Sequence, residues 1–266
     1  MSINSPARCM NWHVETHGSG APLVLIHGWG MHGGVWDSLV PQLAERFCVQ
    51  VVDLPGHGRS PPLPSVRQAA DQLDAIVAAL AQRFDSQPLT VCGWSLGGQI
   101  ALRWAARHPA QVAELVLVAS TPCFAARPDW SCGMAAEVLQ QFAAELELNY
   151  AATLRRFLAL QVRGSENERE LLIRLRAQLF VHGEPDLATL RSGLEILREA
   201  DLRPDLAAIV QPVRVIAGGR DKLTPPEASR YLAASLSNAR LTEIAAAAHA
   251  PFLSHSELFL AALFNN

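Results

Sequence analysis

The chain has 266 residues, half of them hydrophobic, and a formal net charge of −3 at pH 7. That length suits one α/β domain with an insertion, and the small negative charge argues against general affinity for nucleic acid. No run of about 18 successive apolar residues predicts a membrane-spanning helix, and the first residues lack the pattern of a secretory signal.

The five cysteines are scattered along the chain and show no metal-ligand spacing. They are Cys9, Cys48, Cys92, Cys123 and Cys132. We interpret them as thiols of a reducing compartment and expect a cytoplasmic protein without a metal or cofactor.

Six short, apolar, β-branched runs are predicted to be strands that a parallel sheet buries on both faces. They lie at 23–26, 49–54, 89–92, 114–119, 213–217 and 241–244. Helical patterns occur between these runs, at 35–47, 66–84, 99–107 and 226–236. This alternation predicts an α/β fold with a mostly parallel, doubly wound sheet.

The alternation breaks between 121 and 203, where helical patterns occur without a convincing strand. An all-helical insertion between two core strands favours a cap over the active site, although a purely stabilising appendage would show the same pattern. We therefore divide the chain into a core (1–120), a helical cap (121–203) and the second part of the core (204–266).

The most informative motif is Gly-Trp-Ser-Leu-Gly-Gly at 93–98. It follows a predicted strand and precedes a helical pattern, which is the context of a nucleophile elbow. Such a turn exposes its serine in a strained backbone conformation, and the flanking glycines leave room for it. Ser95 is the predicted nucleophile.

An acid and a base follow Ser95 in the order that α/β-hydrolases use, serine, then aspartate, then histidine. Asp221 comes just after the predicted strand at 213–217, and His249 follows the last predicted strand. His249 would accept the proton of Ser95, and Asp221 would orient its ring. Among nine histidines, only His249 combines this position with this order.

Two backbone N–H groups are candidates for an oxyanion hole. One belongs to Leu96, the residue after the nucleophile, at the start of a helix whose dipole favours negative charge. The other belongs to Trp29, in the glycine-containing loop at 27–30 that follows an early strand. An ordinary βα turn would also explain these glycines.

The whole chain resembles the α/β-hydrolase superfamily, and more closely the pimeloyl-[acyl-carrier protein] methyl ester esterases of biotin biosynthesis. The superfamily shares the motifs at 25–30, 52–60 and 93–98, which therefore identify the chemistry only. More specific are stretches inside and beside the cap and around the predicted base, at 119–127, 156–161, 193–197 and 247–255.

This resemblance implies a serine carboxylesterase that releases methanol from the carrier-linked methyl ester, without a cofactor. The acyl chain would lie between cap and core. The implied substrate-binding residues are Trp29, Ser95, Leu96, Phe157, Leu158, Ala159, Leu160, Gln161 and His249. Phe157, Leu158 and Leu160 could instead form the interior of the cap itself.

The resemblance also implies an acidic acyl carrier protein as partner of a monomeric enzyme, contacted by cap arginines. The candidates are Arg155, Arg156, Arg169 and Arg174. Glutamates at 166, 168 and 170 interleave with the arginines, so a mixed, solvated helical face is an equal alternative.

Three other functions remain open at this point. A general short-chain carboxylesterase or lactonase and a carbon–carbon bond hydrolase would use the same three residues. A hydrolase fold reused for binding alone would have no need of the complete set. Dehalogenases and epoxide hydrolases are disfavoured, because they carry an aspartate at the elbow.

Overall fold

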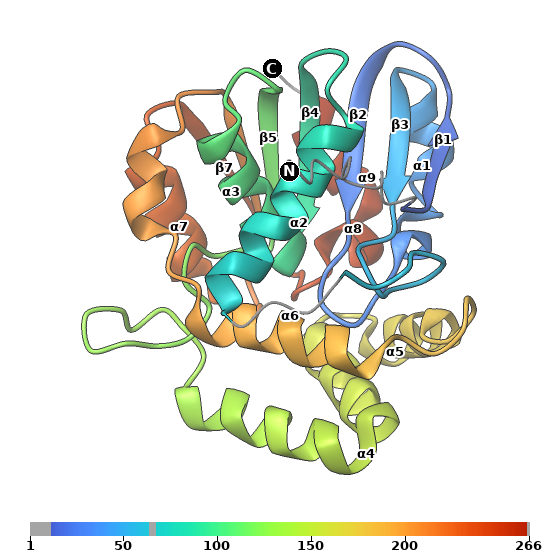
Figure 1. Cartoon of the computed structure of the whole chain (residues 1–266), viewed down its shortest axis with the longest axis vertical. Helices are drawn as coiled ribbons and strands as arrows, with labels where there is room; N and C mark the ends of the chain where they lie inside the picture. Colours follow the sequence, from blue (N-terminus) through green and yellow to red (C-terminus); the bar gives the residue numbers. More distant parts are fainter. Residues whose placement is uncertain (1–11, 64–67, 265–266) are drawn as a thin grey trace, which may run out of the picture.

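The computed structural model describes residues 12–63 and 68–264, which fold around one seven-stranded sheet (Figure 1). The strand order is β1-β3-β2-β4-β5-β6-β7. β1 pairs antiparallel with β3, and the other neighbours pair in parallel. The strands are β1 Val14–His17, β2 Ala21–Ile26, β3 Phe47–Val52, β4 Leu89–Trp94, β5 Val112–Val118, β6 Val213–Gly218 and β7 Ala239–Ile244.

The central strands are buried on both faces, as their continuous apolar sequences predict. In β2 and β5, successive residues such as Leu23, Val24 and Leu25, or Leu115, Val116 and Leu117, are almost fully buried. β1 is not among the predicted strands, because its sequence Val-Glu-Thr-His lacks an apolar run and it lies half-exposed at the edge of the sheet. The predicted α/β class with a mostly parallel sheet is confirmed.

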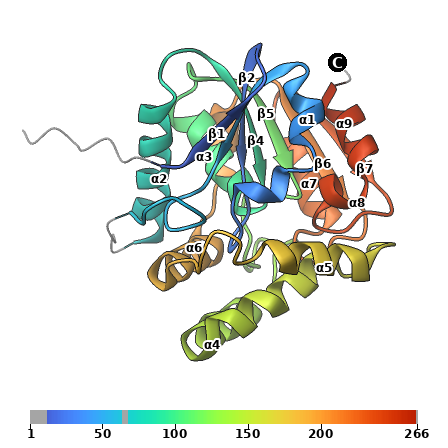
Figure 2. The same ribbon diagram turned by 90° about the vertical axis from the view of Figure 1, so that its right-hand side faces the viewer.

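Helices cover both faces of the sheet, with α2 and α3 on one side and α1 and α9 on the other (Figure 2). Their bounds are α1 Val40–Ala44, α2 Ala69–Arg83, α3 Leu96–Arg107, α7 Pro226–Ser235, α8 Pro251–Ser254 and α9 Ser256–Phe264, with short 3₁₀ helices at Gly33–Trp36 and Arg203–Ala208. Residues 66–67 of the predicted helix at 66–84, and Cys9, lie outside the described residues.

The predicted helix at 35–47 is wrong in extent. The chain instead forms the 3₁₀ turn Gly33–Trp36, then the five-residue helix α1, and β3 already begins at Phe47. Pro41 lies in the first turn of α1. Because proline lacks the N–H that a continuous helix would need there, it starts a new helix instead of extending the previous turn.

Three helices lie together at the carboxyl end of the sheet, between β5 and β6 in sequence (Figures 1 and 2). We call these the cap helices: α4 Ala136–Val162, α5 Glu168–Gln178 and α6 Leu187–Glu199. α4 is kinked at Asn149, whose side-chain oxygen accepts a hydrogen bond from the N–H of Ala152 at 3.0 Å. The asparagine therefore caps the second half of α4. The division into core and cap at 121 and 203 stays a prediction.

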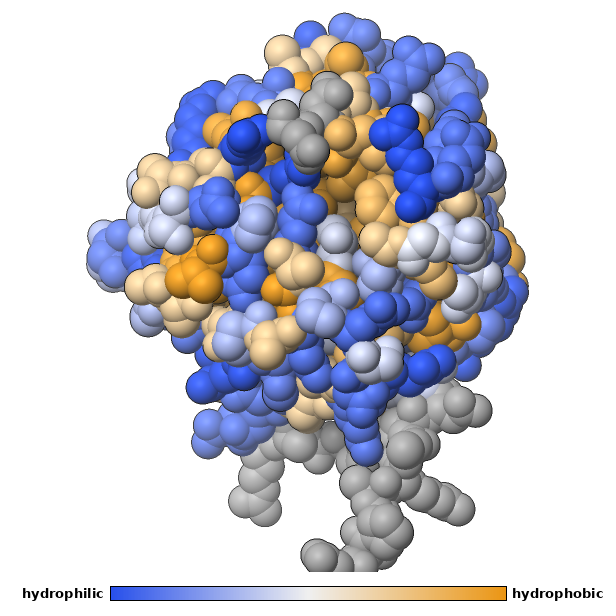
Figure 3. Space-filling model, turned by 90° about the horizontal axis from the view of Figure 1, so that it is seen from above, coloured by the Kyte–Doolittle hydropathy of each residue, from blue (hydrophilic) through white to orange (hydrophobic). Residues whose placement is uncertain are grey.

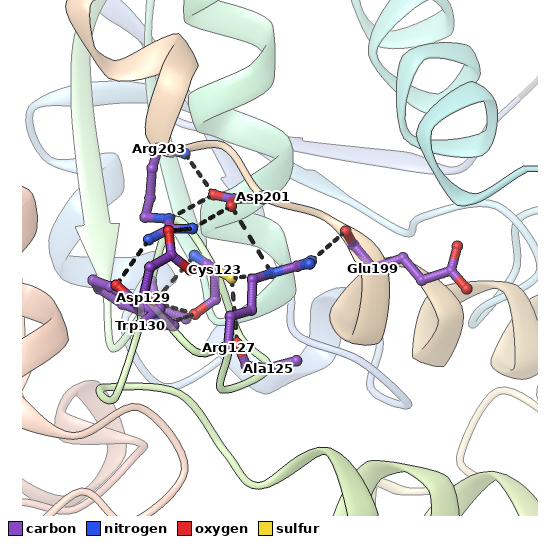
Figure 4. A network of polar contacts seen from close by, with 9 residues as sticks. Cys123, Ala125, Arg127, Asp129, Trp130, Glu199, Asp201 and Arg203 are labelled. Carbon is purple, nitrogen blue, oxygen red and sulfur yellow. Dashed lines mark hydrogen bonds and ion pairs between the residues drawn. The ribbon is translucent and has the colours of Figure 1, made fainter.

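The two chain segments that join the cap helices to the sheet are bound to each other by a polar network (Figure 4). Arg203 donates to both carboxylate oxygens of Asp201, at 2.9 and 2.6 Å, and its guanidinium lies 3.0 Å from a carboxylate oxygen of Asp129. Arg127 donates to the sulfur of Cys123 at 3.2 Å and to the carbonyl of Glu199 at 2.7 Å. We call this network the cap clamp, because it joins the two ends of the chain segment that contains the cap helices.

Arg203, through its hydrogen bonds, holds the pKa of Asp201 below its ordinary value. A carboxyl whose pKa is lowered by folding adds stability above its unfolded pKa, about 3.9, and loses it as the pH falls through the folded value. Asp201→Asn should therefore lower the free energy of unfolding by about 1 kcal/mol at pH 7 and by less below about pH 4. Urea unfolding at pH 7 and pH 3.5 measures both values.

Asp129→Asn is the matched control, because the Asp129 side chain is 70% exposed and an exposed ion pair contributes little. An equal loss from Asp201→Asn at both pH values would show that the carboxylate charge does not stabilise the clamp.

Candidate active site

Ser95 occupies the sharp turn between β4 and α3. Its backbone has φ 56° and ψ −116°, a conformation that costs a non-glycine residue free energy and that active sites retain. Two hydrogen bonds fix it: the Ser95 N–H donates to the carbonyl of Val118 at 3.0 Å, and the Ser120 hydroxyl donates to the carbonyl of Ser95 at 2.9 Å. The predicted nucleophile is thus presented by a strained turn.

The glycines of the motif are required because a side chain at their positions would clash with neighbouring atoms. A Cβ atom on Gly93 would lie 2.2 Å from the carbonyl oxygen of Gly97, and one on Gly97 would lie 2.5 Å from the carbonyl oxygen of Ile26. A Cβ atom on Gly98 would lie 2.4 Å from the Ser120 hydroxyl. Each contact is too short for any side chain, so α3 can start this close to β2 and β5 only with glycine.

The structure brings the three predicted catalytic side chains together. His249 Nε2 lies 2.9 Å from Ser95 Oγ, and His249 Nδ1 lies 2.8 Å from Asp221 Oδ2. Asp221 follows β6, His249 follows β7, and Ser95 follows β4, so parallel strands deliver all three to one end of the sheet. This order of hydrogen bonds is what transfer of the Ser95 proton to the ring requires.

His249 is completely buried and held from two directions. The Trp94 indole N–H donates to the carbonyl of His249 at 2.8 Å, from β4. The N–H of His249 donates to the carbonyl of Gln161 at 3.0 Å, in cap helix α4. The backbone of the candidate base therefore connects the core to a cap helix directly.

Asp221 accepts hydrogen bonds from its own loop as well as from His249. Oδ1 accepts from the N–H groups of Leu223 and Thr224 at 2.8 and 3.0 Å, and Oδ2 accepts from the Thr224 hydroxyl at 2.7 Å. Sequence reasoning missed Thr224. Its signal was a threonine three residues after an aspartate, a spacing at which side chain and backbone commonly bond.

The two candidate oxyanion donors lie beside the nucleophile. Leu96 is the first residue of α3, and a Cβ atom on Gly28 would lie 3.3 Å from the Cβ of Ser95, so the loop at 27–30 approaches Ser95 closely. The Trp29 indole N–H donates to the carbonyl of Leu190 in α6 at 2.8 Å. The assignment of the two backbone N–H groups to an oxyanion hole stays a proposal.

His27 shapes this loop. Its Nδ1–H donates to the carbonyl of Gly28 at 2.8 Å, and its Nε2 accepts the N–H of Leu54 at 2.9 Å. Burial, with the neighbouring His57, holds the pKa of His27 well below its ordinary value. A neutral ring can donate at one nitrogen and accept at the other, so His27 fixes the loop without carrying charge.

The predicted acyl-binding residues of α4 differ in their surroundings. Phe157, Leu158 and Gln161 are buried, whereas Ala159 and Leu160 are half-buried. The Phe157 ring packs edge-on against Trp29, with ring centres 4.8 Å apart. Phe157 therefore belongs both to the interior of the cap helices and to their contact with the loop beside Ser95.

The four candidate docking arginines are all exposed on α4 and α5. Arg156 forms an ion pair with Glu145, and Arg174 forms one with Glu170 at 2.7 Å. Arg155 lies over the ring of Phe180 at 5.8 Å. Both the docking role and the alternative of a mixed, solvated face fit these contacts, and docking stays a proposal.

The amino ends of the parallel strands lie at the end of the molecule opposite the cap helices. Figure 3 views that end, where hydrophilic and apolar residues are interspersed. One surface hollow is lined by Arg214, Asn238 and Arg240 at the amino ends of β6 and β7. Ser95 follows the carboxyl end of a parallel strand, so this hollow lies away from the candidate site.

Residues 12–63 and 68–264 contain no group of three or more His, Cys, Asp or Glu side chains arranged to hold a metal ion. Within the same residues, no helix is both long and apolar enough to cross a membrane.

Comparison with known proteins gives a match to the family model of the alpha/beta hydrolase fold over residues 21–256. The chain is 46% identical to the pimeloyl-[acyl-carrier protein] methyl ester esterase of Nitrosomonas europaea, over 93% of this chain and 96% of that protein. It is also 46% identical to the protein of the same name from Chromobacterium violaceum, over 96% of this chain and 97% of that protein.

Solved structures share the fold at lower sequence identity. An esterase from Exiguobacterium antarcticum matches with a TM-score of 0.85 and 23% identity, over 95% of this chain and 93% of that chain. The enol-lactonase from Burkholderia xenovorans LB400 matches with a TM-score of 0.81 and 24% identity, over 97% of this chain and 98% of that chain.

The hydrogen-bond geometry predicts that His249→Ala lowers kcat on p-nitrophenyl butyrate by about 10⁴-fold or more, because Ser95 would lose its base. The same variant should lose rapid labelling of Ser95 by a serine-directed phosphonate, followed by mass spectrometry. His255→Ala is the control, since that ring bonds to the Ser254 hydroxyl and not to Ser95. If His255→Ala is the more damaging change, the assignment of the base is wrong.

Proposed function

We propose that this chain, which belongs to the α/β-hydrolase family, is a serine carboxylesterase that hydrolyses the methyl ester of pimeloyl-[acyl-carrier protein]. The products would be methanol and pimeloyl-[acyl-carrier protein], in biotin biosynthesis. The observation that carries this proposal is 46% identity over nearly the full length, cap helices included, to relatives named for this reaction. The hydrogen-bonded Ser95, His249 and Asp221 supply its chemistry.

In the first half of the reaction, Ser95 Oγ attacks the ester carbonyl carbon while His249 Nε2 takes the hydroxyl proton. The negative charge on the carbonyl oxygen would be stabilised by the N–H groups of Leu96 and Trp29, each worth about 10²–10³ in rate at such a site. His249 then gives its proton to the leaving oxygen, and methanol departs. Asp221 stabilises the imidazolium that exists between these two proton transfers.

In the second half, a water molecule attacks the acyl-enzyme while His249 takes its proton. The same donors stabilise the second tetrahedral intermediate. Return of the proton to Ser95 Oγ releases the pimeloyl carboxylic acid, still attached to its carrier. Water and the side chains described above are sufficient for each step.

The carrier protein would bind at the exposed face of α4 and α5, outside the buried site. Arg155, Arg156, Arg169 and Arg174 can contact acidic side chains or the phosphate of the prosthetic arm. The reaction would take place in the cytoplasm, with the enzyme as a monomer. A general short-chain carboxylesterase of the same fold is the second candidate, since the same triad would serve it.

Methanol release distinguishes the two candidates. We expect kcat/KM for pimeloyl-[acyl-carrier protein] methyl ester to exceed that for free dimethyl pimelate by about 10²-fold or more, because only the first substrate adds the binding energy of the carrier. Mass spectrometry of the carrier should show loss of one methyl group with the thioester intact. Equal values for both substrates would favour the general esterase.

The cap arginines should affect only the carrier-linked substrate. Arg156→Glu combined with Arg169→Glu should lower kcat/KM for it by about tenfold or more and leave p-nitrophenyl butyrate hydrolysis unchanged. Rim charges mainly speed encounter and are screened over about 10 Å at 0.1 M salt, so added salt should slow the wild-type reaction only with the carrier.

Arg191→Glu combined with Arg198→Glu is the matched control. Both residues lie on α6, where Arg191 is exposed and Arg198 is half-buried, and they pair with Glu147 of α4 and Glu199. The net charge changes equally. If the control pair lowers carrier-linked activity as much, the effect is one of overall charge. Equal losses on both substrates would indicate a damaged cap.

A further inference from the structure

We infer that Thr224 is a positioning residue for the Ser95–His249–Asp221 unit and acts through its hydroxyl group. That hydroxyl donates to Asp221 Oδ2 at 2.7 Å, the same oxygen that His249 Nδ1 contacts at 2.8 Å. The hydroxyl oxygen also lies 3.3 Å from His249 Nδ1. One hydroxyl therefore contacts both partners of the hydrogen bond that orients the base.

The two oxygens of Asp221 are held by different groups. Oδ1 accepts from the N–H groups of Leu223 and Thr224, which fix its place against the loop. Those two bonds act on Oδ1 alone and supply no donor to Oδ2. Because the Thr224 hydroxyl supplies the donor to Oδ2 from the Asp221 loop itself, it fixes the direction in which Oδ2 faces the ring.

The hydroxyl is itself fixed by the fold. Thr224 is 1% exposed, and Pro225 and Pro226 follow it at the start of α7. Proline holds its own backbone φ angle near one value and restricts the residue before it. The Thr224 side chain is β-branched and therefore stiff about its first torsion angle, so the hydroxyl approaches Oδ2 from one direction.

The bond matters most when His249 carries a proton. The imidazolium and the Asp221 carboxylate then form a buried ion pair, and a buried carboxylate is stable only when donors surround it. A misdirected Oδ2 would leave the imidazolium without its acceptor in both transition states. Loss of the hydroxyl should therefore lower kcat and leave KM unchanged, because substrate binding does not involve this oxygen.

Thr224→Val, Thr224→Ser and wild-type enzyme are compared on p-nitrophenyl butyrate, and in the rate of Ser95 labelling by a serine-directed phosphonate. Valine keeps the shape of threonine without the hydroxyl, so we expect kcat and the labelling rate to fall together by about tenfold, with KM within a factor of about two. Thr224→Ser keeps the hydroxyl and should restore most of both rates.

Thr153→Val is the matched control. Thr153 is also buried, but its hydroxyl donates to the carbonyl of Asn149 within α4 at 3.0 Å, so both rates should stay near wild type. Thermal unfolding of each variant shows whether it is folded. If Thr224→Val destabilises the protein, Thr224→Ala and Thr224→Ser are compared at a temperature where both are folded.

Wild-type rates in Thr224→Val would overturn the inference, and would mean that the hydroxyl only satisfies its own hydrogen-bonding need. Equal losses in Thr224→Val and Thr224→Ser would overturn it too, because the hydroxyl that serine retains would then not restore either rate. The inference rests on the proposed triad but not on the carrier substrate. Full activity in His249→Ala would refute the triad itself. If His249→Ala lowers the rates and Thr224→Val does not, only the role of Thr224 is refuted.

Discussion

The strained backbone of Ser95 is the constraint on which the rest of the site depends. A side chain at φ 56° can be held only if its neighbours leave no alternative. Here the carbonyl of Val118 and the hydroxyl of Ser120 fix the peptide groups on either side. Glycines let α3 begin within contact distance of β2. The strain is thus balanced by hydrogen bonds and close contacts with the strands beside the turn and the residues that follow them.

The cap helices contribute to the site through backbone atoms as much as through side chains. The carbonyl of Gln161 accepts the N–H of His249, and the carbonyl of Leu190 accepts the indole of Trp29. The cap clamp around Asp201 holds together the two chain segments that lead into and out of the cap helices. The geometry of the base and of the loop beside Ser95 therefore depends on where the cap helices lie.

The sequence was sufficient to predict features that follow from local pattern or from chain order. Apolar runs predicted β2 to β7, and the glycine motif predicted the turn at Ser95. Chain order selected Asp221 and His249. It was not sufficient for features set by tertiary contact. The spacing of Asp221 and Thr224 predicts a local hydrogen bond, but only the fold shows that the same hydroxyl also lies beside His249. The pairing of Asp201 with Arg127 joins residues 74 positions apart. The predicted helix at 35–47 is wrong in extent because Pro41 starts a new helix within an apolar pattern that continues on both sides of it.

Ser95 is only 3% exposed, so the part of a substrate that reacts must extend from the surface to a buried hydroxyl. The proposed substrate has two acyl groups open to attack, the methyl ester at the tip and the thioester at the carrier, and the thioester is intrinsically the more reactive. A folded carrier protein cannot follow its acyl chain beneath the cap helices. If the acyl chain lies between cap and core as proposed, the bulk of the carrier would keep the thioester outside, and only the far end of the chain would reach the serine. Selectivity between the two bonds would come from reach and not from chemistry.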